Sequence, residues 1–215
     1  MGGFFDFLSE RRDDMISMGI AHIWLVAISV AISAVIGVIL GIIAYQRPKL
    51  GTGILGVTSA FLTIPSFALF VLLLPVVGLG APPVIIALML YGLLPVVRNT
   101  ITGLREVDPA IIESAQGMGM NRRERLLKIE LPMAWPVIMT GIRVTTVMLV
   151  GIATIGAIVL GPGYGSLIFD GLGHAGVPVA VNLVLAGILG TIVVAIIFDA
   201  LFTLIGRLTT SRGLR

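Results

Sequence analysis

The side chains that could do chemistry are few in this sequence and lie far apart. There are no cysteines, and the two histidines, His22 and His174, are too isolated to indicate a metal site. The only lysines, Lys49 in RPKLG and Lys128 in LLKIE, lack the glycine-rich spacing of a phosphate-binding loop. No Ser/His/Asp set or carboxylate pair suggests a catalytic centre. We therefore predict a chain that is not an enzyme and holds no cofactor or metal.

The composition is that of a membrane protein. Hydrophobic residues make up 57% of the 215 residues and charged residues 12%, whereas soluble domains carry about 25% charged residues. A single soluble core could not hide this much apolar surface, but several membrane-spanning helices could. The net charge of +3 is attributed to basic loops at the membrane surface, so we expect no nucleic-acid partner.

Five apolar stretches are long enough to cross a bilayer as helices. We predict an all-α membrane protein with a short tail at each end, residues 1–18 and 207–215. No signal peptide is apparent at the start, so we expect the first span to remain uncleaved. The predicted spans are residues 19–45, 53–78, 82–104, 134–160 and 179–206, and the one sizeable polar segment is the central loop, residues 105–133.

The basic residues predict the orientation in the membrane, because positively charged loops stay on the cytoplasmic side. Twelve of the 14 Lys and Arg residues fall on one side of the five-span arrangement. Only Arg11 and Arg12 fall on the other side, among four nearby acidic residues. We therefore expect the N-terminus outside and the C-terminus inside.

The central loop has the local chemistry of two short helices joined by a turn. Asp108 is placed to cap the first helix. Gly117 and Gly119 can supply the backbone freedom that a reversal needs. Asn121 begins a capping-box pattern for the second helix, which Pro132 is expected to end.

The spacing within this loop resembles the EAA loop of binding-protein-dependent ABC importer permeases. That pattern is EAA, three residues, Gly, nine residues, Ile-x-Leu-Pro. The sequence departs from it at one position, where serine replaces the first alanine, and serine is small enough to keep the docking role. The residues at the motif positions are Glu113, Ser114, Ala115, Gly119, Ile129, Leu131 and Pro132.

The resemblance implies a MetI-like, type I importer permease in the bacterial cytoplasmic membrane. Its first loop helix would sit in a groove of an ATPase subunit and transmit closure of the ATPase dimer to the spans. The implied partners are two ATP-binding-cassette subunits that carry ATP and Mg²⁺, a second permease copy or paralogue, and an extracytoplasmic substrate-binding protein. Membrane lipid and a small solute complete the set.

Further stretches are similar to osmoprotectant permeases, which carry glycine betaine, carnitine, choline or proline betaine. The similarity includes TIPSFAL at 63–69, YGLLPVVRNTITGL at 91–104, ESAQGMGM at 113–120 and LPMAWPVIMTGIR at 131–143. Other importers share the five-span plan, so a different small solute such as an amino acid remains the alternative. The scattered Trp and Tyr residues indicate that the binding protein, rather than this chain, selects the solute with an aromatic cage; a cage assembled from two permease copies is the alternative.

Asp199 is an acid inside the fifth predicted span, where an unpaired charge costs about 2.5 to 3.5 kcal/mol. We expect it to form a latch with Arg98 or Arg143, since both basic residues fall near the cytoplasmic ends of spans. Direct contact with the solute is the alternative role.

Three further residues are candidates for the translocation pathway. Pro65 removes a backbone hydrogen bond within the second predicted span and is expected to kink it; the kink with Ser66 could open the pathway or serve packing alone. Gly156 belongs to a run of small residues on the fourth span, which could form a sliding pore wall or a close helix contact.

Two other transport classes fit the sequence less well. Gly163, Tyr164 and Gly165 match part of a potassium-channel filter, but the residues before them are Gly and Pro rather than Thr and Val. A proton-coupled secondary transporter would be expected to show internal repeats and acidic relays, whereas five spans do not divide into equal halves.

Overall fold

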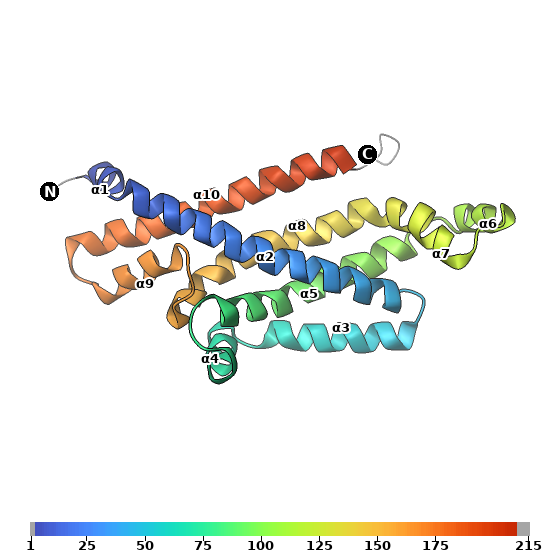
Figure 1. The fold of residues 1–215 in the computed structure, drawn as a ribbon, viewed down its shortest axis with the longest axis horizontal. Helices are drawn as coiled ribbons and strands as arrows, with labels where there is room; N and C mark the ends of the chain where they lie inside the picture. The colour runs from blue at the N-terminus through green and yellow to red at the C-terminus, as the bar shows by residue number, and fades with distance from the viewer. Residues whose placement is uncertain (1–2, 210–215) are drawn as a thin grey trace.

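Residues 3–209 of the chain are described by a computed structural model, and within them every regular element is a helix (Figure 1). Four helices are long and apolar enough to cross a membrane, and the bent pair α3 and α4 makes a fifth if it is one span. The predicted all-α membrane fold is therefore confirmed. The helices are α1 (Phe4–Glu10), α2 (Arg12–Ala44), α3 (Pro48–Thr63), α4 (Ser66–Val77), α5 (Ala81–Arg105), α6 (Pro109–Gly117), α7 (Arg122–Arg125), α8 (Leu131–Ile155), α9 (Gly165–Gly173) and α10 (Pro178–Thr209).

The long helices run roughly along one axis, and their connections gather at two ends. At one end, on the right of Figure 1, α2 passes to α3, α5 passes to α6 and α7, and α10 ends. At the opposite end lie α1, α9 and the start of α10. Most of the basic loops therefore share an end, which we call the basic end. The predicted tail at 207–215 begins inside α10, and its residues 210–215 lie outside the described residues.

The contact between α2 and α5 depends on small residues. Added Cβ atoms at Gly37 and Gly41 of α2 would lie 2.7 Å from Val96 and 2.5 Å from Thr100 of α5. This Gly-x-x-x-Gly pair lets the two backbones approach closely, as is common between helices in membranes. The close contact fixes α5 against α2, and α5 leads directly into the central loop.

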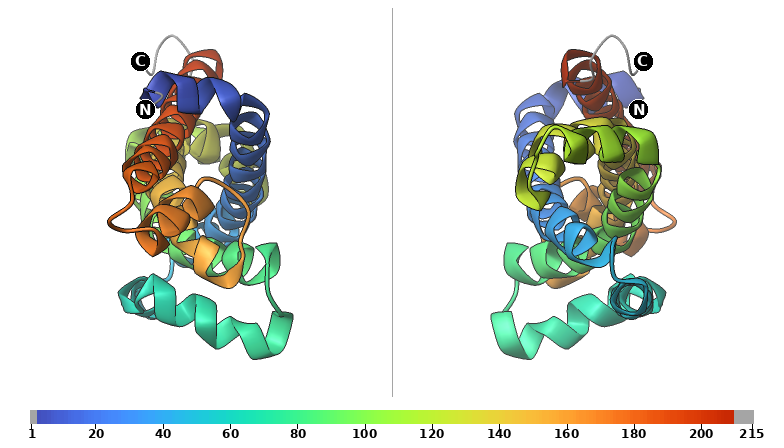
Figure 2. Two further views of the ribbon diagram at one scale, coloured as in Figure 1. Left: turned by 90° about the vertical axis from the view of Figure 1, so that its left-hand side faces the viewer. Right: turned by 90° about the vertical axis from the view of Figure 1, so that its right-hand side faces the viewer.

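The second predicted span, 53–78, is interrupted rather than kinked. α3 and α4 meet at an angle of 96°, and Figure 2 shows both lying beside the main bundle. Ile64 takes an extended conformation because it precedes Pro65, which disfavours helical geometry in the residue before it. The break frees the carbonyl of Ile64, which accepts a hydrogen bond of 3.1 Å from the Tyr91 hydroxyl.

Pro132 does not end the second loop helix, contrary to the prediction. The helix runs without interruption from Arg122 to Val159, so the central loop passes directly into the fourth span. A π-helical turn at Leu126–Glu130 precedes α8, and Pro132 lies in the first turn of α8. The π turn shifts the hydrogen-bond pattern by one residue, so the missing N–H of the proline is tolerated there.

Candidate functional site

The first helix of the central loop begins as predicted. The Asp108 carboxylate accepts a 2.8 Å hydrogen bond from the Ala110 N–H, and Pro109 occupies the first helical position. This cap satisfies an N–H group that has no partner within the helix. The resulting helix, α6, stands at the basic end of the bundle, beyond the long helices (Figure 1).

Gly119 makes the reversal between α6 and α7. Its φ is +82°, in the left-handed region that L side chains rarely adopt. The turn is closed by a hydrogen bond of 3.1 Å from the Met120 N–H to the Ala115 carbonyl. Gly117, which was expected to share this role, is the last residue of α6 and has no positive φ. Of these two glycines, therefore, only Gly119 is needed for a positive φ at this turn.

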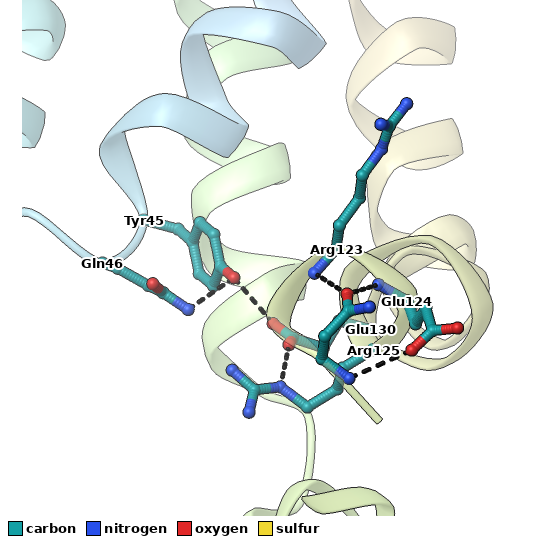
Figure 3. A network of polar contacts seen from close by, with 7 residues as sticks. Tyr45, Gln46, Arg123, Glu124, Arg125 and Glu130 are labelled. Atoms are coloured by element: carbon teal, nitrogen blue, oxygen red, sulfur yellow. Dashed lines mark hydrogen bonds and ion pairs between the residues drawn. The ribbon is translucent and has the colours of Figure 1, made fainter. Parts of the chain in front are cut away.

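The predicted capping box opens α7. The Asn121 side chain accepts hydrogen bonds of 3.0 Å from the N–H groups of Arg123 and Glu124. In return the Glu124 carboxylate accepts a bond of 3.1 Å from the Asn121 N–H (Figure 3). Asn121 and Glu124 thus hold the second loop helix in a fixed register after the Gly119 turn.

The motif residues divide between an outward and an inward side. Glu113 and Ser114 are exposed on α6, whereas Ala115 is 1% exposed. The Ser114 hydroxyl donates to the Ala110 carbonyl at 2.8 Å, so the serine that replaces alanine satisfies its hydroxyl within α6. Of the remaining motif residues, Ile129 and Leu131 are half-buried and Pro132 is exposed. An exposed, capped helix of this kind is suited to insertion into a groove on a partner.

The sequence analysis missed the residue that ties this loop to the bundle, Glu130. Its side chain is 1% exposed, and its carboxylate receives bonds from the Tyr45 hydroxyl at 2.8 Å and the Arg125 Nε at 2.7 Å (Figure 3). The Gln46 amide in turn donates to the Tyr45 oxygen at 2.6 Å. Both carboxylate oxygens are therefore occupied, as a buried charge requires. The available signal was an acid between Ile129 and Leu131, two motif positions of apolar type.

Tyr45 follows the last residue of α2 and lies outside that membrane-spanning helix. Burial, and then the hydrogen bond and negative charge of Glu130, raise the pKa of Tyr45 to about 12. Its hydroxyl therefore stays protonated and donates to Glu130 at physiological pH. The Tyr45 carbonyl accepts a bond of 3.0 Å from the Arg105 Nε at the end of α5. The ends of α2 and α5 are thus joined to each other and to the central loop.

Asp199 of α10 pairs with Arg143 of α8. The two hydrogen bonds are 2.6 Å from Nε to Oδ1 and 2.9 Å from Nη2 to Oδ2. Arg98, the other predicted partner, is exposed on α5. The arginine that Asp199 binds is Arg143. The pair connects α8 to α10 through two residues that are 56 positions apart in the sequence.

The candidate pathway residues differ in their surroundings. Pro65 is exposed and Ser66 half-buried at the break between α3 and α4. Gly156 is buried, and a Cβ there would lie 2.8 Å from the Val84 side chain. Gly156 therefore lies in a close helix contact between the end of α8 and α5, and its role in the pathway stays a prediction.

The filter-like tripeptide is used for packing. Tyr164 is buried, and its hydroxyl donates to the Met15 carbonyl at 2.9 Å. Its side chain fills the space beside Gly19 and Gly190, where added Cβ atoms would lie 2.6 Å from the hydroxyl oxygen and from the ring, respectively. No group of three metal-binding side chains occurs within residues 3–209, and the His22 ring instead lies 3.1 Å from the Val150 carbonyl.

Comparison with known families matches residues 33–211 to the binding-protein-dependent transport system inner membrane component family. One relative is the osmoprotectant import permease protein OsmW of Salmonella typhimurium, 37% identical over 97% of this chain and 98% of the relative. Another is the glycine betaine/carnitine/choline transport system permease protein OpuCB of Bacillus subtilis, 33% identical over 100% of this chain and 97% of the relative.

A second Salmonella relative, the osmoprotectant import permease protein OsmY, is 35% identical over 93% of this chain and 84% of its own length. Among solved structures, a chain of the MetNI methionine ABC transporter, described in inward-facing conformations, superposes with a TM-score of 0.81. The match covers 98% of this chain and 100% of that chain at 21% identity, so it supports the fold alone.

Proposed function

The chain belongs to the family of binding-protein-dependent transport system inner membrane components, and from this we propose the permease subunit of an ATP-driven osmoprotectant importer. The main support for this proposal is the similarity to osmoprotectant permeases over nearly the whole chain. The relatives' names give the solute class: glycine betaine, carnitine or choline.

The geometry of the central loop supports a role in coupling to an ATPase. Glu113 and Ser114 face outward on a capped helix, and Glu130 ties the same loop to α2. A force applied to α6 would therefore reach the spans through rigid contacts rather than a flexible linker. ATP and Mg²⁺ would be held by two cytoplasmic ATPase subunits that dock on this loop.

The other proposed partners are a substrate-binding protein on the outer side and a second permease. A paralogue is one option for that second permease, since Salmonella has two related permease proteins, OsmW and OsmY. A second copy of this chain is the other option. Intact masses of the purified complex would distinguish a pair of identical permeases from a mixed pair.

The test of the proposed function is uptake by the complete importer in liposomes, with its ATPase and binding protein. We expect ATP-dependent uptake of at least one of glycine betaine, carnitine, choline or proline betaine. The control omits ATP. The alternative, a permease for an amino acid, would be favoured by uptake of an amino acid with none of the four osmoprotectants.

We further propose that the N-terminus lies outside and the C-terminus inside the cell. The support is the grouping of basic residues at one end of the bundle, the end that carries the central loop (Figure 1). A protease added to intact spheroplasts is expected to remove an N-terminal tag and spare a C-terminal one. Removal of both tags from the same side would contradict this orientation.

A further inference from the structure

The Arg143–Asp199 ion pair joins two apolar helices of membrane-spanning length. Arg143 is fifteen residues, or about 22 Å of helix, from Lys128 at the basic end. Asp199 is eight residues, or about 12 Å, from Arg207 near the end of α10. Both residues therefore lie within helices that are long and apolar enough to cross a membrane, rather than in the loops.

The rest of the chain does not shield this pair. The side chains of Arg143 and Asp199 are 45% and 44% exposed. Exposure of charged groups to lipid is strongly unfavourable, so polar residues inside membranes usually face a bundle interior or a water-filled cavity. The surface that carries the pair is therefore expected to face water or another polypeptide rather than lipid.

An open cleft of about 270 Å³ lies beside the pair, between α8 and α10. Arg143 and Thr140 line it from α8 beside apolar residues, and Phe202, Thr203 and Arg207 line it from α10. It thus brings together two arginine side chains, hydroxyl-bearing residues and an aromatic ring, with the Asp199 carboxylate bound to Arg143.

We propose that the Arg143–Asp199 pair is a binding element of the translocation pathway, specific for a zwitterionic solute with a carboxylate and a quaternary ammonium. Guanidinium groups bind carboxylates through two parallel hydrogen bonds, so Arg143 takes the solute carboxylate. Asp199 and the face of the Phe202 ring take the cationic end. The solute exchanges with the ion pair, which reforms when the solute leaves.

This inference rests on the proposed function and is tested in the complete importer with glycine betaine, carnitine and proline betaine as probes. We expect Arg143→Gln and Asp199→Asn each to reduce uptake about ten-fold or more, because each removes a charge-assisted contact with the solute. ATPase stimulation by the loaded binding protein is expected to persist, because the central loop is unchanged. The charge swap Arg143→Asp with Asp199→Arg restores a tie between α8 and α10, so full uptake by the swapped importer would overturn the proposal.

Accessibility gives a second, independent readout. Because the chain has no cysteines, Asp199→Cys introduces its single thiol, and labelling of this subunit is read by mass. A charged, membrane-impermeant thiol reagent is expected to modify position 199 in the assembled importer. The matched control is Ile197→Cys, 47% exposed and on the opposite side of α10, where no labelling is expected.

The two proposals fail in different ways. If the unaltered importer carries none of the osmoprotectants, the proposed function itself is wrong. If it carries them but position 199 is unreactive in the assembled complex, the pair is covered by the second permease or by lipid. In that case the importer assignment stands and the pathway site does not.

Discussion

We expect the importer with Gly119→Val to lose solute uptake, while its permease still inserts and its binding protein still holds solute. Gly119 has a φ of +82°, a conformation that costs an L residue about 1–2 kcal/mol and a β-branched residue more. The turn would relax to a negative φ, which would move α6 relative to α7. Glu113 and Ser114 would then be misplaced for docking on the ATPase. The measurements are uptake in liposomes and ATPase stimulation by the loaded binding protein.

The matched control is Gly117→Val, two residues earlier in the same loop. A Cβ at either glycine meets no atom within 4 Å, so space is not the difference between the two variants. Gly117 has no positive φ, and its variant is expected to keep most of its uptake. Full, ATP-coupled uptake by Gly119→Val in a correctly assembled complex would show that this turn is not required for coupling.

The second large effect is expected at Glu130. Replacement of Glu130 by alanine would leave the largely buried Arg125 side chain, which is 12% exposed, without its ion-pair partner. Breaking a buried pair by removing one partner costs about 3–5 kcal/mol of the free energy of unfolding. We therefore expect a clearly lower thermal unfolding midpoint for the detergent-solubilised importer, together with weaker coupling of ATP hydrolysis to uptake.

Two further variants serve as comparisons for the unfolding midpoint of Glu130→Ala. Tyr45→Phe removes only the hydroxyl that donates to Glu130 and is expected to cost about 1–3 kcal/mol, because the carboxylate keeps its bond to Arg125. Glu106→Ala removes an exposed acid close to the same loop and is expected to leave the midpoint unchanged. A midpoint for Glu130→Ala equal to that of Glu106→Ala would mean that the network does not hold the loop.

Local features of the central loop were predictable because their causes lie within a few residues. Asp108 caps the helix that begins immediately after it, and Asn121 exchanges hydrogen bonds with a residue three positions later. Gly119 takes a positive φ that glycine tolerates better than any other residue. Such short-range rules operate before any tertiary contact forms, so the two helix caps and the turn between them could be predicted from the sequence.

Proline effects were predicted less well, because the surroundings decide their outcome. At Pro65 the chain turns through 96° instead of kinking, and a buried Tyr91 satisfies the freed carbonyl of Ile64. At Pro132 a π turn absorbs the missing N–H, and the helix continues into the fourth span. The compensation at Pro65 comes from a residue distant in sequence, since Tyr91 is 27 residues from Ile64, whereas the π turn lies immediately before Pro132.

The sequence by itself determined the membrane class, the apolar stretches and the motif that indicates the family, because composition, length and fixed spacing are properties of the chain alone. Only the tertiary structure decided which arginine pairs with Asp199, since Arg98 and Arg143 carry the same charge and differ only in where their helices pack. It also decided that Glu130 meets Tyr45 across 85 residues. Partners so distant in sequence leave no periodic pattern, and helix packing alone brings them within hydrogen-bonding distance.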